Sequence, residues 1–276
     1  MEYIEINISG LSGENAEILS AELSEYGFEG FSEEEEGGLN AFIPAGSFDV
    51  MPVANFLEER SFTMGFRYRV NRVPGQNWNA IWESAYQPVL VSGRCMIRAP
   101  FHQPDPLAEF DLIIEPKMSF GTAHHETTHL MIETILETDF RGMKVLDIGC
   151  GTGILAILAA KMGAVRILAV DNDEWAYANT LENTVRNNAG MICVIHGDAS
   201  KVNEGDFNII MANINRNVLL GDMMAYRTFL VDGGLLMLSG FYSDDTKIIT
   251  EKADSLGFRI SCIRELNNWV VATFIK

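Results

Sequence analysis

Residues 145–153 read VLDIGCGTG, an apolar run that contains Asp147 and ends in three glycines at alternate positions. Residues 154–161 continue with the apolar pattern of a helix. A strand, a glycine turn and a helix in this order allow the backbone to approach a ligand at the start of the helix. A second apolar run ends in Asp171, 22 positions after Gly149. A carboxylate there can accept hydrogen bonds from both hydroxyls of a ribose, so the sequence predicts a nucleoside site.

The spacing of the glycines indicates which nucleoside binds. Dinucleotide sites use G-x-G-x-x-G, but here Ile154 takes the sixth position. Asp147 stands two residues before the first glycine, where its charge would repel a pyrophosphate and would suit a cationic ligand. S-adenosylmethionine carries a sulfonium and an amino group. We therefore predict this cofactor, with Asp147, Gly149, Gly151 and Asp171 around it; a nicotinamide-dependent oxidoreductase and an ordinary βα turn are the alternatives.

The chain after the glycine turn alternates strands with helices. The expected elements are helix 174–188, strand 191–196, strand 207–211, helix 218–229, strand 234–238 and helix 244–256. Two neighbouring strands, 259–264 and 269–275, close the chain as a hairpin, which makes one late strand antiparallel. The fold class is therefore α/β, with a Rossmann-like, mostly parallel, seven-stranded sheet of the methyltransferase type and helices on both faces.

The first seventy residues follow a different pattern. The expected elements are strand 3–8, helix 12–26, strands 28–32 and 39–43, helix 47–59 and strand 62–70. This β-α-β-β-α-β order is ferredoxin-like. Pro74 and Gly75 mark a hinge, a short aromatic helix is expected over 78–86, and a strand pair at 96–100 and 112–116 follows. We place a small α+β domain at 1–73, a linker at 74–92 and the methyltransferase domain at 93–276.

The chain has a net charge of −18, and residues 1–75 alone carry −10. An acidic surface repels phosphate backbones and attracts basic proteins, so we expect a basic protein partner and no direct binding of long nucleic acid. General solubility would explain the same charge. No apolar run approaches 18 residues, the first residues lack a secretory pattern, and the four cysteines form no C-x-x-C pair. We therefore expect a cytoplasmic protein that makes no contact with a membrane.

Residues 125–129 spell H-E-x-x-H, a pattern that binds zinc in metalloproteases. His125 and His129 would share a helix face, and Glu133 lies one turn further on, but no signature identifies it as a third ligand. Because the run lies at the entry to the helix just before the first strand of a Rossmann sheet, we reject zinc and predict no metal. Helix 127–136 is instead expected to cover the ligand, with threonine hydroxyls near its start.

Four segments together resemble the ribosomal protein L-eleven methyltransferases of the PrmA type. They are residues 77–82 (NWNAIW), 120–128 (FGTAHHETT), 145–153 (VLDIGCGTG) and 211–214 (MANI). The resemblance covers nearly the whole chain. One departure is Ala123, which replaces the second glycine of the family's F-G-T-G-x-H-x-T-T segment and narrows the range of φ there. The N-terminal region is also divergent in sequence.

The resemblance implies that S-adenosylmethionine contacts Thr128, Gly149, Asp171 and Asn213. It also implies that the enzyme methylates lysine side-chain and N-terminal amines of ribosomal protein L-eleven, free or on the ribosome, and that the N-terminal domain recognises this substrate. We expect the enzyme to be a monomer. The alternatives are a methyltransferase for another protein, RNA or a small molecule, and a non-catalytic adaptor.

Three further residues have two interpretations each. The amide oxygen of Asn213 is placed to accept a hydrogen bond from an incoming amine, or Asn213 caps the next helix. Phe120 covers the methionine part of the cofactor, or it simply packs. Asp198 reaches the adenine amino group, or it is a turn residue.

Overall fold

The computed structural model describes residues 2–11, 13–34, 38–73, 86–117 and 119–276. The chain separates into two compact units, Met1–Ala85 and Tyr86–Lys276. Apart from Tyr86, the short aromatic helix expected over 78–86 lies outside the described residues.

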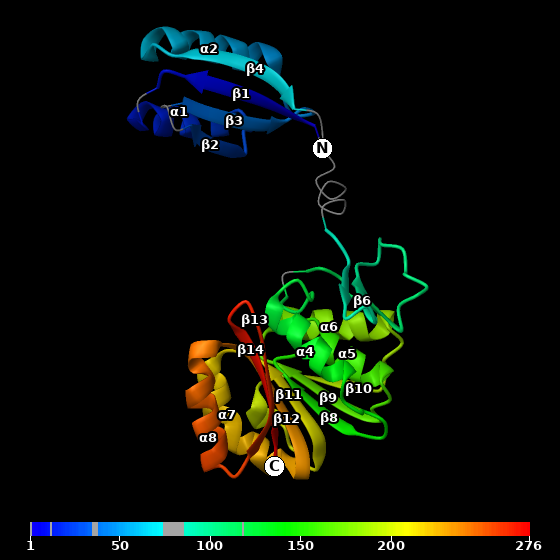
Figure 1. Ribbon diagram of the computed structural model, residues 1–276. Helices are drawn as coiled ribbons and strands as arrows, with labels where there is room; N and C mark the ends of the chain where they lie inside the picture. The colour runs from blue at the N-terminus through cyan, green and yellow to red at the C-terminus, as the bar shows by residue number, and fades with distance from the viewer. Residues whose placement is uncertain (1, 12, 35–37, 74–85, 118) are drawn as a thin grey trace. The chain divides into compact units, whose positions relative to one another are not determined.

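The N-terminal unit is a four-stranded antiparallel sheet with two helices on one face (Figure 1). Its elements are β1 (Tyr3–Ser9), α1 (Gly13–Glu25), β2 (Gly30–Glu34), β3 (Gly38–Pro44), α2 (Val50–Met64) and β4 (Arg67–Val73). The strand order is β2-β3-β1-β4. Ile6 and Ile8 of β1 pack with Leu19 of α1 and Leu57 of α2 in one apolar core. The element order confirms the expected ferredoxin-like pattern.

The expected strand at 62–70 is wrong at its start, because α2 continues to Met64. The hydroxyls of Ser61 and Thr63 donate to carbonyl oxygens one turn back, which accommodates both polar residues within the helix. Gly65, at φ +74°, then ends the helix in the left-handed conformation. Phe62 is therefore a helical residue, and it is 92% exposed.

The second unit begins with a three-stranded sheet of β5 (Val89–Val91), β6 (Cys95–Arg98) and β7 (Phe110–Ile113). Strand β5 pairs with β6. Since β5 lies inside the range expected to be a linker, 74–92, the packed part of this unit starts before residue 93.

A seven-stranded sheet forms the centre of the second unit. Its strands are β8 (Lys144–Ile148), β9 (Arg166–Asp171), β10 (Ile192–His196), β11 (Phe207–Asn213), β12 (Leu230–Tyr242), β13 (Arg259–Leu266) and β14 (Trp269–Ile275). The order is β10-β9-β8-β11-β12-β14-β13, and β14 is antiparallel to both of its neighbours. This confirms the mostly parallel, Rossmann-like sheet with one antiparallel strand.

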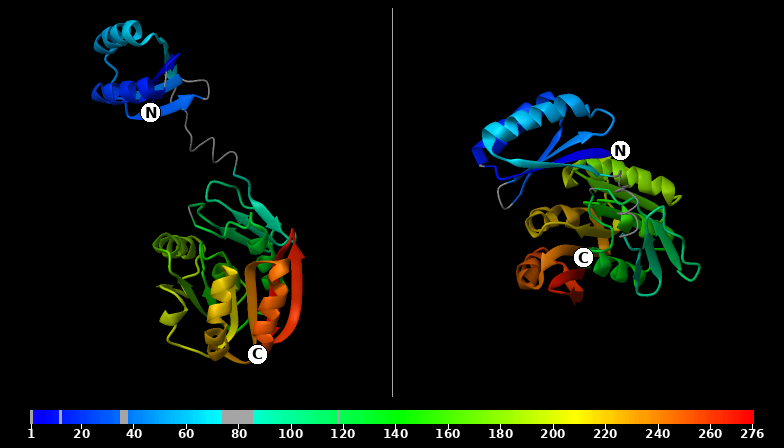
Figure 2. Two further views of the ribbon diagram at one scale, coloured as in Figure 1. Left: turned by 90° about the vertical axis from the view of Figure 1, so that its left-hand side faces the viewer. Right: turned by 90° about the horizontal axis from the view of Figure 1, so that it is seen from above.

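Helices cover both faces of this sheet (Figures 1 and 2). The helices are α4 (Glu126–Leu136), α5 (Ile154–Lys161), α6 (Glu174–Arg186), α7 (Arg216–Phe229) and α8 (Thr246–Ser255), with short 3-10 turns η1 (Ala199–Lys201) and η2 (Ser243–Asp245). Val145 of β8 faces the core made with α4 and α5, whereas Leu146 and Ile148 face the core made with α7 and α8. Within the described ranges, no helix is long and apolar enough to cross a membrane.

The strand order reverses at β8, which lies between β9 and β11. In open parallel sheets, ligands bind at the carboxyl ends of the strands on either side of such a reversal. The glycine turn, Asp171 and Asn213 all lie at these ends.

Candidate active site

The glycine turn makes room for two other segments of the chain. Gly149 and Gly151 have φ values of +71° and +57°. A Cβ on Gly149 would lie 2.1 Å from Ile214 Cγ2, and one on Gly151 would lie 2.3 Å from the carbonyl oxygen of Phe120. The sequence predicts a close approach of this turn to a ligand. The structure shows that the space beside both glycines is taken by the protein itself.

Asp171 is fixed at the edge of a first cavity. Its Oδ2 accepts a hydrogen bond from the Gly151 N–H at 2.8 Å, and its Oδ1 accepts one from the Asp173 N–H at 3.0 Å. The cavity, of about 240 Å³, is called here the Asp171 cavity. Its walls are Ile148, Gly149, Val170, Asp171, Asn172, Gly197, Asp198, Ala199, Ile214, Asn215, Val218 and Asp222.

Asp198 both caps a turn and lines the Asp171 cavity. Its Oδ1 accepts hydrogen bonds from the N–H and the hydroxyl of Ser200, which lower the pKa of its carboxyl. Burial and the charge of Asp198 raise the pKa of Asp222, which lines the same cavity from α7. The turn role of Asp198 is thus confirmed, while its contact with adenine stays a prediction.

A second cavity, of about 300 Å³, has three rings in its wall and is called here the Phe120 cavity. It is lined by Phe120, His125, Thr127, Asn213, Ile214, Asn215, Gly240 and Trp269. The His125 ring lies 5.2 Å from that of Phe120 and 4.7 Å from that of Trp269, centroid to centroid. Phe120 itself is 52% exposed, so it forms an accessible wall rather than part of the core.

Asn213, a residue of this cavity's wall, contains an unsatisfied buried polar atom. Its Nδ2 donates to Thr128 Oγ1 at 3.4 Å, but its buried Oδ1 has no hydrogen-bond partner among the described residues. The expectation that Asn213 caps the next helix is wrong, because Asn215 caps α7 by accepting from the Asn217 N–H at 2.9 Å. Buried acceptors are nearly always hydrogen-bonded in proteins, so Asn213 Oδ1 indicates a donor on a ligand.

Ile214 separates the two cavities and lines both of them. Glycines flank it on two sides: Gly149, described above, and Gly240 of β12, where a Cβ would lie 2.2 Å from the Ile214 carbonyl oxygen. Ile214 therefore occupies a slot that larger neighbours would close.

Asp147 lies beneath the turn and lines neither cavity. It is completely buried, and its Oδ2 accepts from the Ala156 N–H of α5 at 3.2 Å. Burial raises the pKa of its carboxyl to about 7; the Ala156 N–H opposes this shift and the charge of Asp171 adds to it. Its contact with a cationic ligand stays a prediction, and the present geometry favours an effect of its charge over direct contact.

The two histidines of the H-E-x-x-H run have other partners. His125 caps α4, since its Nδ1 accepts from the Thr127 N–H at 3.3 Å. His129 Nε2 lies 3.7 Å from Glu133 Oε1. In the part of the chain that the structure describes, no three His, Cys, Asp or Glu side chains are grouped so that they could hold a metal ion.

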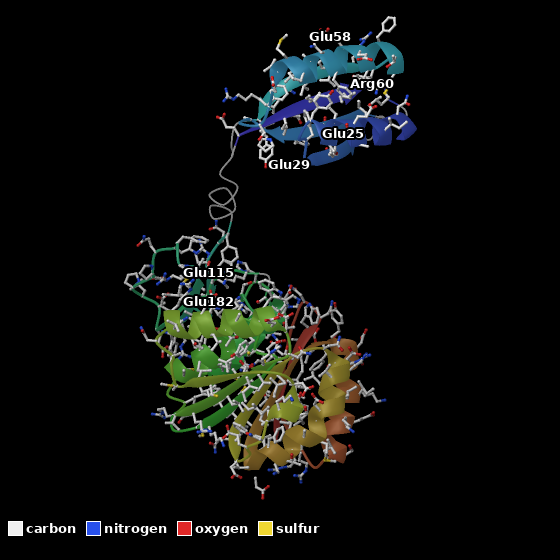
Figure 3. All side chains as sticks on the ribbon, turned by 180° about the vertical axis from the view of Figure 1, so that it is seen from behind. Glu25, Glu29, Glu58, Arg60, Glu115 and Glu182 are labelled. Atoms are coloured by element: carbon white, nitrogen blue, oxygen red, sulfur yellow. The ribbon has the colours of Figure 1, made fainter. Side chains whose placement is uncertain are left out.

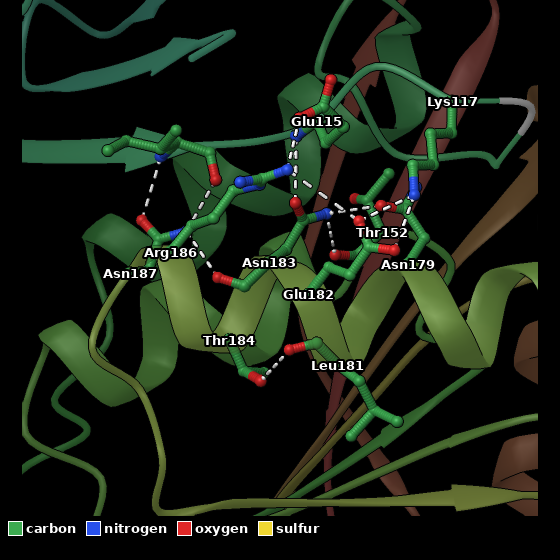
Figure 4. Close-up of polar contacts among 11 residues, drawn as sticks. Glu115, Lys117, Thr152, Asn179, Leu181, Glu182, Asn183, Thr184, Arg186 and Asn187 are labelled. Carbon is green, nitrogen blue, oxygen red and sulfur yellow. Dashed lines mark hydrogen bonds and ion pairs between the residues drawn. The ribbon is translucent and has the colours of Figure 1, made fainter.

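Two buried polar residues near the turn were not anticipated from the sequence. Thr152 donates from its N–H to the Phe120 carbonyl at 2.9 Å and from its hydroxyl to the Gly121 carbonyl at 2.5 Å. Asn183 of α6 donates to the Thr152 carbonyl at 2.9 Å (Figure 4). The available signal was three asparagines four residues apart, at 179, 183 and 187, on a helix whose other faces are not uniformly apolar.

Comparison with known proteins places this site in a family. The profile described as "Ribosomal protein L11 methyltransferase (PrmA)" matches residues 4–276. The chain belongs to this family. The ribosomal protein L11 methyltransferase of Porphyromonas gingivalis is 47% identical over 261 residues, which cover 94% of this chain and 90% of that one. The protein of the same name from Phocaeicola vulgatus is 40% identical over 284 residues, covering 100% and 99%.

The fold of this PrmA family member also matches a solved structure. The crystal structure of the ribosomal protein L11 methylase from Lactobacillus delbrueckii subsp. bulgaricus matches with a TM-score of 0.65 at 25% identity, covering 69% of this chain and 99% of that chain. The resemblance and the methyltransferase fold are thereby confirmed, and this fold supports S-adenosylmethionine as the cofactor.

Proposed function

We propose that this protein transfers methyl groups from S-adenosylmethionine to lysine side-chain and N-terminal amines of ribosomal protein L11. The observation that carries the chemistry is the buried Oδ1 of Asn213, which has no partner in the described part of the chain and belongs to a residue of the Phe120 cavity wall. An N–H of the incoming amine would satisfy this acceptor. The names of relatives that are 47% and 40% identical support the substrate.

The residues around the Asp171 cavity fit the nucleoside part of the cofactor. Each oxygen of Asp171 already accepts one main-chain N–H, yet a carboxylate oxygen can accept a second hydrogen bond, here from a ribose hydroxyl. Asp198 faces the same cavity as an acceptor for the adenine amino group. When bound, S-adenosylmethionine supplies an activated methyl group on a cationic sulfur. Phe120 would cover its methionine part.

The Phe120 cavity fits the acceptor amine. A lysine ammonium has an ordinary pKa of about 10.4, so the amine must lose a proton before it can attack. The rings of Phe120, His125 and Trp269 would replace part of the water around a bound amine, and such desolvation lowers the pKa of an amine. The cavity stays open enough for the released proton to pass to solvent, since Phe120 is 52% exposed. Asn213 Oδ1 then accepts an N–H of the neutral amine and orients its lone pair. Placement, rather than a dedicated general base, accounts for the reaction.

The N-terminal unit, residues 1–73, is proposed to bind the substrate protein. Figure 3 shows Glu25, Glu29 and Glu58 on its surface, and residues 1–75 carry a net charge of −10. A basic ribosomal protein is attracted to such a surface. We further propose a cytoplasmic monomer that does not bind long nucleic acid directly. Sedimentation with and without a ribosomal RNA fragment tests this; a dimer or an RNA complex would contradict it.

The substrate is tested with L11 purified from cells that lack the modification, supplied with S-adenosylmethionine labelled in the methyl group. Wild-type protein should label L11, and absence of label would refute the substrate. Asn213→Ala should lower kcat about 100-fold, because misplacement of a reacting group costs that order of rate. Since the resemblance also implies a contact between Asn213 and S-adenosylmethionine, cofactor affinity is measured alongside, and a loss of kcat larger than the loss of affinity supports the role at the amine. Asn217→Ala, at an exposed residue nearby, is the control; equal kcat values for the two variants would refute the role of Asn213.

A further inference from the structure

We infer that Asn183 is a positioning residue for methyl transfer. By holding Thr152, it fixes the position of Phe120, in the wall of the Phe120 cavity, relative to the glycine turn. The inference rests on the proposed function for its catalytic readout. It concerns a side chain that lines neither cavity and acts only through its neighbours.

Asn183 is fully buried, and both ends of its amide are engaged (Figure 4). Its Nδ2 donates to the Thr152 carbonyl at 2.9 Å and to Asn179 Oδ1 at 3.1 Å. Its Oδ1 accepts from the Glu115 N–H at 2.9 Å. One side chain of α6 thus joins the glycine turn to the segment that leads toward Phe120.

Thr152 passes this constraint to the cavity wall. Its N–H and hydroxyl hold the carbonyls of Phe120 and Gly121, while its own carbonyl is held by Asn183. Gly121 and Thr152 are closely packed, since a Cβ on Gly121 would lie 2.9 Å from Thr152 Oγ1. The same turn reaches the other cavity, where the Gly151 N–H donates to Asp171. Movement of Thr152 would therefore disturb both cavities.

Asn187, one helical turn along, offers a matched comparison. Its Oδ1 accepts from the Ile113 N–H at 2.9 Å and its Nδ2 donates to the Ile113 carbonyl at 2.7 Å. Like Asn183 it is buried and holds the incoming chain, but it does not contact the glycine turn. Its Nδ2 also donates to the Asn183 carbonyl at 2.9 Å, which is a contact with the main chain of α6 and not with the Asn183 amide. Replacing either asparagine with aspartate turns the donor toward a carbonyl into an acceptor. The two changes are chemically alike, and only the first reaches Thr152.

The experiment compares full-length Asn183→Asp and Asn187→Asp with wild type in three measurements: the melting temperature, the affinity for S-adenosylhomocysteine by calorimetry, and kcat and KM for L11. Both variants should melt at similarly lowered temperatures. Asn183→Asp should lower kcat about 30-fold and weaken S-adenosylhomocysteine about fivefold, with KM for L11 within about twofold, because a misplaced wall affects the reacting groups more than docking. Asn187→Asp should keep all three kinetic and binding values within about threefold of wild type.

Equal losses in the two variants, or no loss in Asn183→Asp, would overturn the inference. If wild type labels no L11, the proposed substrate fails, while the S-adenosylhomocysteine affinities still decide the positioning role. Should Asn183→Asp not fold, Thr152→Val removes only the hydroxyl that holds Gly121. Thr152→Val should lower kcat about fivefold, whereas Thr152→Ser keeps the hydroxyl and should have the kcat of wild type. If wild type, Thr152→Val and Thr152→Ser have indistinguishable kcat values, that result would count against the inference.

Discussion

The two cavities share Ile214 and Asn215 but are built in opposite ways. In the Asp171 cavity, the carboxylates of Asp171 and Asp198 are already held by main-chain N–H groups. In the Phe120 cavity, three rings form part of the wall and the buried Asn213 Oδ1 has no partner within the described residues. The first is organised before its ligand arrives, which lowers the entropy lost on binding. In the second, the Asn213 acceptor is left for the incoming group.

The largest expected effect comes from closing the turn that supports the Asp171 cavity. Gly151→Ala should weaken S-adenosylhomocysteine more than about 100-fold, because its Cβ would meet the Phe120 carbonyl oxygen at 2.3 Å, a main-chain atom that cannot rotate away. Calorimetry measures the affinity. Gly142→Ala is the control: its φ is +74° and nothing lies within 4 Å of the added Cβ, so it bears the left-handed strain alone. Equal behaviour of the two variants would show that collision is unimportant.

The buried carboxyl of Asp147, below the glycine turn, should make the stability of the protein depend on pH. Its carboxyl has a pKa of about 7 in the folded protein against an ordinary value of 3.8, so between these values the folded state binds more protons than the unfolded chain. The stability that this group contributes therefore falls by roughly 4 kcal/mol as pH rises from about 4 to 7, and it is flat above that. In Asp147→Asn this component should vanish and the protein should be more stable at pH 8 than wild type.

Denaturant melts from pH 4 to pH 8 measure this slope. Asp139→Asn is the control, because Arg141 lowers the pKa of Asp139 to about 2 and its titration falls below this range. If the unfolding free energy of Asp147→Asn depends on pH as steeply as that of wild type, the burial of Asp147 does not cause the loss of stability.

Asp171→Asn tests whether the preorganised carboxylate is needed as an acceptor for a ribose. We expect S-adenosylhomocysteine to bind about 10-fold to 30-fold more weakly. An amide has half the acceptor capacity of a carboxylate, and its NH2 group would face the main-chain N–H groups that the carboxylate now accepts from. Asp173→Asn in the same loop should change affinity less than about twofold, because asparagine replaces aspartate well as a helix cap. Similar affinities for the two variants would remove Asp171 from the site.

The smallest effect is expected at Ala123, a core residue three positions after Phe120. Ala123 is a buried non-glycine residue at φ +65°. Ala123→Gly relieves left-handed strain of roughly 1–2 kcal/mol but loses a buried methyl and adds unfolded-state entropy of similar size, so the net change should be under about 1 kcal/mol. Ala123→Val adds branching at the same φ and should destabilise the fold. Thermal melts distinguish them, and a large gain from glycine would show that the methyl contributes little.

Local patterns predicted the architecture well, because strand and helix periodicity and the acids at strand ends depend on neighbouring residues. Together with the family resemblance they identified Gly149, Asp171, Phe120 and Asn213 as residues of one cofactor site, and the structure divides these four between two cavities. They failed where distant segments meet. Asn183 reaches Glu115 across 68 positions and Thr152 across 31, and no periodicity encodes either contact. Gly149 and Gly151 are needed because distant residues, Ile214 and Phe120, lie against them. The full burial of Asp147 also depends on distant contacts.

Ile214 acts as a spacer of fixed thickness. Its slot is bounded by Gly149 after β8 and by Gly240 within β12, so the main chains of neighbouring strands, rather than adjustable side chains, set the separation between the two cavities. Substitutions around either rim can change what is bound without changing how far apart the bound groups are held. The methyl acceptor could thus diversify in such a fold while the reaction distance stayed constant.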